Sequence, residues 1–182
     1  MADTRTVAGV ELVKVGTWHT MTGEWTVTAA DLRSALAAHQ ARVLRKPIVK
    51  LGHTDPRFDG EPALGHIDNL RLTDDGSTLV GDLLGVPAWL AEAMPTTYPD
   101  RSVEALTDYE AADGTTYPLV LTAVALLGTA RPSITDLASL QDLVAATAGS
   151  GRRIILAACS GGTDRHRTVT VAAARRRRLH RK

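Results

Sequence analysis

Short apolar runs separated by turn-forming residues are the feature that most restricts how this chain can fold. Strand-like runs lie at residues 8–19, 48–53, 63–72, 77–86, 101–110 and 117–128. Turn signals, Asp-Asp-Gly at residues 74–76 and Asp-Gly at residues 113–114, separate neighbouring runs. Short apolar or alternating runs indicate strands, and a tight turn between two of them indicates a hairpin. We therefore expect a hairpin over residues 63–86 within a mainly antiparallel β core.

Three further segments show helical patterns. Thr28, with Asp31 three residues later, resembles a capping box at the start of AADLRSALAAHQARVL, which predicts a helix. Pro87 is placed to begin a short second helix that Pro95 should end. Apolar residues at helical spacing over residues 133–148 predict a third helix. The combination of strands and helices predicts an α+β fold with helices at the periphery of the β core.

Charge is distributed very unevenly along the chain, although the net charge is only +1. Residues 149–182 contain ten Arg or Lys residues and one Asp, a charge of +9, so residues 1–148 carry −8. An acidic body followed by a basic end indicates a folded domain with a solvated arm. We expect a domain over residues 1–148 and a basic, disordered tail over residues 149–182.

The composition also excludes several classes of protein. A single cysteine, Cys159, rules out an internal disulfide. No apolar run reaches the ~18 residues that a membrane span needs, and the first residues lack the pattern of a secretory signal. The chain has one Phe, three Trp and three Tyr, too few for an aromatic platform that binds single-stranded nucleic acid. We expect an intracellular protein with no membrane partner.

A few residues are candidates for chemistry. His53 ends an apolar run where a loop begins, although a lone histidine is more often structural. Ser102 opens a predicted strand, without the GxSxG elbow of one large hydrolase class. His53, Asp55 and His66 form a weak metal-binding combination, without an HExxH or paired-cysteine pattern, so we expect no metal and no other cofactor. Cys159 lies in the basic tail and is not expected to be a nucleophile.

Five stretches follow one another in a distinctive order: KPIVKLGHTD, GEPALGHIDNLRL, DGSTLVGDLLGVPAWLAEAM, YPDRSVEAL and DGTTYPLVLTAVALLGTARPSI. They place a His at a strand end, then a glycine-containing strand, a hairpin, a short helix, and a Ser that opens a strand about fifty residues after the His. From about residue 9 to residue 137 this pattern resembles the capsid maturation (prohead) serine proteases of tailed bacteriophages, which are related in fold to the herpesvirus assembly protease. The resemblance implies a mainly antiparallel, β-barrel-like core with peripheral helices.

The resemblance implies that Ser102 is the nucleophile and His53 the general base of a serine endopeptidase. A third group holds the imidazole, and in this superfamily it varies among His, Asp and Glu. Glu104 lies two residues after Ser102 and therefore on the same face of a strand. Asp136 and His66 are alternatives for this role, and Glu104 as a solvated strand residue is an equally open interpretation.

Other roles follow from the same resemblance. Backbone N–H groups are the usual donors to the oxyanion, and Arg131 is a candidate orienting cation, with an ordinary loop charge as the alternative. The expected substrates are the phage major capsid protein and the scaffold protein, cleaved inside the assembling procapsid in the cytoplasm of the bacterial host. The protease is expected to be a homo-oligomer.

The chain also departs from the family pattern, because many relatives continue into a long, charged, helical scaffold segment and this one continues into residues 149–182. One alternative function is therefore a non-catalytic capsid assembly or scaffold protein, including a decayed prophage remnant that keeps the fold. Another is a nucleic-acid-binding protein that acts through the arginine-rich tail. By charge alone, the tail is suited to contact nucleic acid or an acidic capsid surface, and either contact should weaken steeply with salt.

Overall fold

A computed structural model of the chain describes residues 3–20, 22–53 and 61–143. In chain order the elements are β1 (Thr4–Lys14), β2 (Gly16–Thr20), β3 (Gly23–Val27), α1 (Ala29–Ala41), β4 (Ile48–Leu51), β5 (His66–Leu72), β6 (Thr78–Pro87), α2 (Ala88–Thr97), β7 (Asp100–Glu110) and β8 (Thr116–Leu127). No helix in the described residues is long and apolar enough to span a membrane. The predicted boundary near residue 148 and the basic tail lie outside the described residues.

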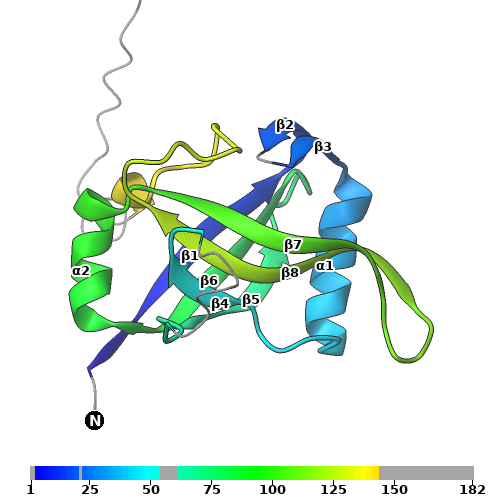
Figure 1. The fold of residues 1–182 in the computed structure, drawn as a ribbon, viewed down its shortest axis with the longest axis horizontal. Helices are drawn as coiled ribbons and strands as arrows, with labels where there is room; N and C mark the ends of the chain where they lie inside the picture. Colours follow the sequence, from blue (N-terminus) through cyan, green and yellow to red (C-terminus); the bar gives the residue numbers. More distant parts are fainter. Residues whose placement is uncertain (1–2, 21, 54–60, 144–182) are drawn as a thin grey trace, which may run out of the picture. The chain divides into compact units, whose positions relative to one another are not determined.

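Six strands form one sheet in the order β1-β6-β5-β4-β8-β7, while β2 and β3 form a separate hairpin. All pairings are antiparallel except that of β4 with β8, which is parallel. In Figure 1, α2 lies at the left end of the sheet and α1 at the right end. The α+β class and the mainly antiparallel core are therefore confirmed. Inside the curled sheet lies a core of fully buried apolar side chains that includes Leu12, Val49, Ile67, Leu83 and Val124.

The sheet does not close into a barrel, so the expectation of a barrel-like core is wrong in this respect. Within the described residues no backbone pairing joins its two edge strands, β1 and β7. The buried side chain of Arg101 connects them instead, because its Nε donates to the carbonyl oxygen of Glu11 in β1 at 2.6 Å. Its Nη1 donates to the carbonyl oxygen of Ala138 at 2.6 Å. The guanidinium of Arg101 thus lies between β1 and β7, the two strands that backbone hydrogen bonds would join in a closed barrel.

Helix α1 begins as the sequence predicts. The side-chain oxygen of Thr28 accepts from the N–H of Asp31 at 3.3 Å, and Asp31 Oδ2 accepts from the N–H of Thr28 at 2.7 Å. This reciprocal pair is the capping box, and it satisfies two N–H groups that the first helical turn leaves without partners. The helix ends where Arg42 adopts a left-handed conformation, with φ of 55°.

Helix α2 begins after Pro87 as expected, but the prediction that Pro95 ends it is wrong, since the helix continues to Thr97. Pro95 has no N–H to donate to the carbonyl of Ala91, so one intrahelical hydrogen bond is absent, but the φ that its ring fixes is compatible with helical geometry. The final turn is closed by the N–H of Tyr98, which donates to the carbonyl oxygen of Met94 at 3.0 Å.

The third predicted helix is wrong over residues 133–139, which form bends, one turn and irregular backbone, and helical structure begins only at Leu140. Backbone groups of Ala138 have tertiary partners instead: its N–H donates to Glu11 Oε2 at 2.7 Å, and its carbonyl accepts from Arg101. Ser139 then acts as an N-cap, because its Oγ accepts from the N–H of Gln141 at 3.0 Å.

The hairpin predicted over residues 63–86 is confirmed as β5 and β6. The strand expected within residues 8–19 is divided into β1 and β2, and β3, the partner of β2, was not predicted. The division falls at Val15, next to Gly16, which begins β2 with φ of 154°, and a Cβ on Gly16 would lie 2.6 Å from the Trp18 ring. Only glycine therefore allows Trp18 to fold back and donate its Nε1–H to the carbonyl of Lys14 at 3.0 Å.

Candidate active site

Two alanines of strand β8 allow side chains from its neighbouring strands to meet. Ala125 pairs with Lys50 of β4 on one side and with Ser102 of β7 on the other, and Ala123 pairs with Glu104. Residues that lie opposite each other in a sheet project from the same face. Lys50, Ser102 and Glu104 therefore project together over two methyl groups, where larger side chains would fill the space between them.

His53 reaches the same group through a turn after β4. The N–H of Gly52 donates to the carbonyl oxygen of Leu126 at 2.9 Å, and the left-handed conformation of Gly52, with φ of 59°, redirects the chain. His53 Nδ1 then lies 2.8 Å from Glu104 Oε1. Because an ionised carboxylate only accepts, a neutral imidazole in this contact carries its hydrogen on Nδ1 and keeps Nε2 as its basic nitrogen.

Glu104 is held in its ionised form. Partial burial raises the pKa of Glu104, but hydrogen bonds from Lys50 and His53 outweigh burial and keep this pKa below its ordinary value. Lys50 Nζ lies 2.8 Å from Oε1, the same oxygen that His53 contacts. An ionised carboxylate that fixes the Nδ1–H of a histidine is the arrangement that orients a general base in serine hydrolases.

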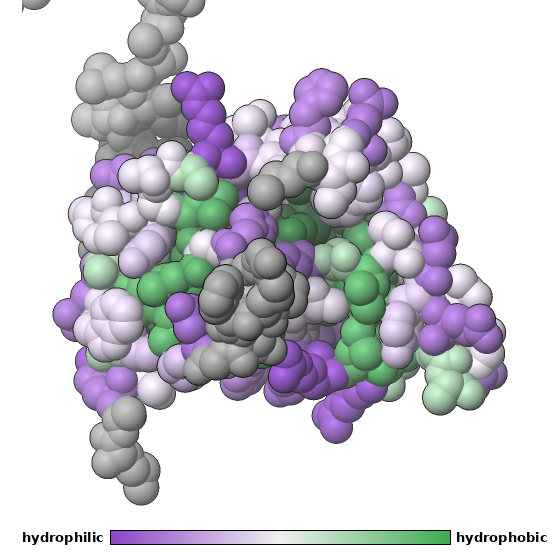
Figure 2. All heavy atoms as spheres, in the orientation of Figure 1, coloured by the Kyte–Doolittle hydropathy of each residue, from purple (hydrophilic) through white to green (hydrophobic). Residues whose placement is uncertain are grey.

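A cavity of about 470 Å³ lies along β7 beside these residues. Figure 2 shows hydrophobic side chains in a hollow on this face, with hydrophilic side chains around it. The walls come from β7, from the β2–β3 hairpin and its turn, and from the segment after β8. The lining residues are Leu12, Thr20, Thr22, Trp25, His53, Arg101, Ser102, Val103, Glu104, Ala105, Thr107, Ser133, Ile134 and Leu137.

Ser102, His53 and Glu104 all line this cavity, so the structure brings the three sequence candidates to one place. The contact between imidazole and carboxylate is formed, whereas within the described residues no hydrogen bond joins Ser102 to His53. Hydrogen bonds between a nucleophile and its base are often long in free enzymes and shorten when substrate binds. The site thus contains the His53 imidazole, which Glu104 orients, and Ser102, which projects from the same face of β7 as Glu104.

The alternatives for the third group form no hydrogen bond with His53 within the described residues. Asp136 forms an ion pair with Lys14 at 3.7 Å. His66 is the first residue of β5 and pairs with Ile48. Of the three candidates for this role, Glu104 is the one that contacts His53 within the described residues.

The remaining sequence candidates do not add to this site. Arg131 is exposed and is not among the described residues that line the cavity, although the nearby Ser133 and Ile134 are. In the part of the chain that the structure describes, no three His, Cys, Asp or Glu residues lie close enough to hold a metal ion. Asp55 and Cys159 lie outside that part.

Sequence reasoning missed two parts of the site. Lys50 was not singled out, although it is the only charged residue in the apolar run IVKLG and lies three residues before His53. The wall formed by Thr20, Thr22 and Trp25 was also missed, because strand β3 was not predicted. Comparisons of the chain with protein-family models, with curated proteins and with solved structures find no match.

Proposed function

We propose that this protein is a serine endopeptidase in which Ser102 is the nucleophile, His53 the general base and Glu104 the group that orients the imidazole. The observation that carries the proposal is the 2.8 Å contact between His53 Nδ1 and Glu104 Oε1, with Ser102 two residues away on the same strand face. This contact leaves His53 Nε2 to accept a proton, which a serine hydroxyl must lose to become a strong nucleophile.

The reaction would proceed in two steps. Ser102 Oγ attacks the carbonyl carbon of the scissile amide while His53 Nε2 takes the hydroxyl proton, and the negative charge moves to the carbonyl oxygen. His53 then gives this proton to the leaving amine as the C–N bond breaks, which leaves an acyl-enzyme. Water hydrolyses the acyl-enzyme by the same route, and the proton returns to Ser102. Glu104 stays ionised throughout and stabilises the imidazolium.

The edge strand β7 supports a peptide as substrate rather than a small ester. In the described part of the chain its outer edge has no strand partner, and the cavity is lined by six of the residues between 101 and 107. An extended peptide can pair its backbone with such an edge and place alternate side chains on either face. The buried Leu12 and Ile134 give the cavity an apolar floor for one of these side chains.

The biological setting that we propose comes from the resemblance to the prohead proteases. The substrates would be the phage major capsid protein and the scaffold protein, cut by an oligomer inside the procapsid in the host cytoplasm. The alternative of a non-catalytic capsid assembly or scaffold protein is favoured by one observation, the absence of a hydrogen bond between Ser102 and His53 within the described residues.

Co-expression with the cognate capsid and scaffold proteins tests the proposal, with intact mass as the measurement. Wild-type protein should produce defined truncations, and Ser102→Ala and His53→Ala should each slow cleavage by at least about 1,000-fold. Ser77→Ala and His19→Ala, which lie outside the cavity, are the matched controls and should cleave like the wild type. If the wild type leaves every partner uncut while capsids still assemble, the catalytic proposal is wrong and the scaffold alternative takes its place.

A further inference from the structure

One carboxylate oxygen, Glu104 Oε1, has two cationic or polar partners at the same distance. His53 Nδ1 and Lys50 Nζ each lie 2.8 Å from it. The three groups come from different places: Lys50 from the middle of β4, His53 from the turn after that strand, and Glu104 from β7. The carboxylate that orients the imidazole is therefore itself bound by a second side chain from another strand.

The position of Lys50 follows from the sheet. Its neighbour in the strand, Val49, is completely buried in the core, so the lysine projects from the opposite face. There it crosses the alanines of β8 to reach Glu104, and only 17% of its side chain is exposed. A charge that is mostly withdrawn from water requires an opposite charge to compensate, and here the structure supplies one carboxylate.

We propose that Lys50 is a positioning residue of this site, whose ammonium group holds the Glu104 carboxylate in the place and charge state that fix the His53 ring. Without Lys50, the Glu104 side chain, which is one-third exposed, would keep only its contact with the His53 side chain, which is 36% exposed. It would then rotate among several side-chain conformations, and the hydrogen on Nδ1 would lose its fixed acceptor. The effect of Lys50 on cleavage rests on the proposed function, whereas its effect on the imidazole does not.

The test reads the tautomer of His53 in the full-length protein. Nitrogen chemical shifts of the ring, measured by NMR at a pH where the imidazole is neutral, show whether the hydrogen is on Nδ1 or on Nε2. Three variants are compared with the wild type: Lys50→Met, which removes the charge and keeps the stem; Lys50→Arg, which keeps the charge; and Lys46→Met. The last removes another lysine that is ion-paired with a carboxylate, Asp68, and so serves as the matched control.

We expect the hydrogen on Nδ1 in the wild type, in Lys50→Arg and in Lys46→Met, and a shift toward the Nε2–H form in Lys50→Met. An amide spectrum of each variant reports whether the protein remains folded. The proposal is overturned if folded Lys50→Met keeps the wild-type tautomer, if Lys46→Met loses it equally, or if the wild type already carries its hydrogen on Nε2.

Cleavage provides the second measurement. Lys50→Met should lower the kcat of peptide cleavage by about 10- to 100-fold, because the base is no longer fixed, and Lys50→Arg should recover most of it. A wild type without any cleavage would contradict the proposed endopeptidase, but the tautomer comparison would still decide the role of Lys50. Normal cleavage by a folded Lys50→Met would overturn the positioning role even if the function is right.

Discussion

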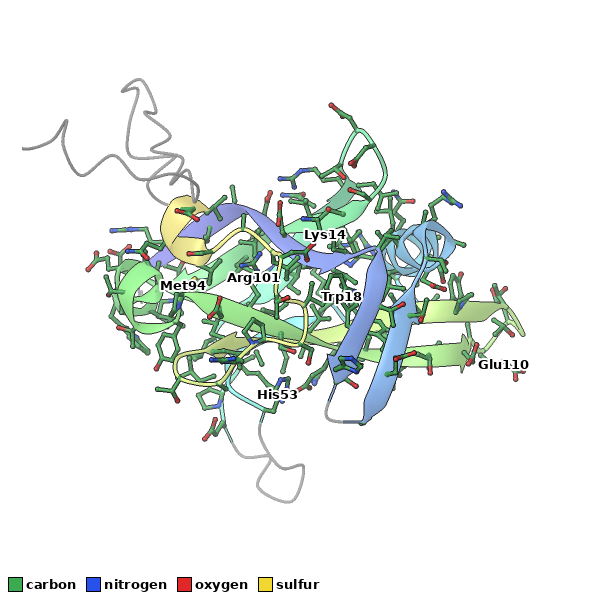
Figure 3. The ribbon with its side chains drawn as sticks, turned by 90° about the horizontal axis from the view of Figure 1, so that it is seen from above. Lys14, Trp18, His53, Met94, Arg101 and Glu110 are labelled. Atoms are coloured by element: carbon green, nitrogen blue, oxygen red, sulfur yellow. The ribbon has the colours of Figure 1, made fainter. Side chains whose placement is uncertain are left out.

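At the scale of single residues, Arg101 shows how one side chain can connect parts of the fold that are distant in sequence. Its guanidinium is almost completely buried and donates to backbone carbonyls of β1 and of the segment after β8. Burial lowers the pKa of Arg101 to about 10, despite the opposing effect of the nearby Glu11 and Asp100, so it stays charged at neutral pH. Figure 3 shows Arg101 and His53 on opposite sides of the β7 ribbon. Arg101 joins the two edges of the sheet, and Ser102, the next residue of β7, lines the cavity of the candidate site.

Replacing Arg101 should therefore lower stability. In Arg101→Met the carbonyls of Glu11 and Ala138 lose their donors, and we expect the free energy of unfolding to fall by about 1–3 kcal/mol. The loss is limited because Nη2 is buried without a hydrogen-bond partner among the described groups, so the wild type is not fully satisfied either. Urea unfolding measures the change, and Arg33→Met on the exposed face of α1 is the control. An equal effect of the two substitutions would contradict this role of Arg101.

At the scale of elements, local signals and tertiary contacts determine different parts of the helices. The start of α1 is set by the capping box within four residues of sequence, so a short pattern was sufficient to predict it. The segment over residues 133–139 has helical spacing as well, but the N–H and carbonyl of Ala138 bond to Glu11 of β1 and Arg101 of β7 in place of helical partners. A helical pattern predicts a helix only where no stronger tertiary partner competes for the backbone groups.

The contribution of the capping box can be measured directly. Thr28→Ala removes the oxygen that accepts from the N–H of Asp31, and we expect a loss of about 1 kcal/mol in the free energy of unfolding. Thr28→Ser keeps the oxygen and should retain most of the stability. Chemical denaturation of the two variants checks this prediction, and equal stability of Thr28→Ala and wild type would show that the cap contributes nothing.

At the scale of the whole molecule, carboxylates whose pKa is lowered by partners from other elements link stability to pH. The pKa of Asp68 is lowered mainly by Lys46, against burial, with a smaller effect of His39. Burial raises the pKa of Asp82, but hydrogen bonds from Gly9, Asn69 and Arg71 outweigh it, and the pKa is lowered overall. Because these groups bind protons more readily when unfolded, their stabilisation is complete above the unfolded pKa and is lost as the pH falls toward the folded value.

We therefore expect the free energy of unfolding to be nearly constant above about pH 5 and to fall below it, since unfolded Asp and Glu titrate near pH 4. Asp82→Asn should lower stability at neutral pH, because Arg71 loses its ion pair, and should make the decrease in acid shallower. Urea unfolding at a series of pH values measures both effects. Glu92→Gln, on the exposed side of α2, is the control. A pH profile of Asp82→Asn that runs parallel to the wild type would contradict this linkage.

The sequence by itself determined the features that depend on neighbouring residues. The β5–β6 hairpin, the start of α1 and the common face of Ser102 and Glu104 all follow from turn chemistry, capping and the two-residue period of a strand. These features need no knowledge of distant parts of the chain.

Only the tertiary structure decided which groups meet across the sheet. His53 reaches Glu104 because β8, which lies between β4 and β7, carries alanines at the crossing, whereas neither Asp136 nor His66 forms a hydrogen bond with His53 among the described residues. The contact of Lys50 with Glu104, the open edge of the sheet and the irregular backbone over residues 133–139 also depend on long-range contacts. Strand order is set by how the whole core packs, and no local pattern records which strands become neighbours.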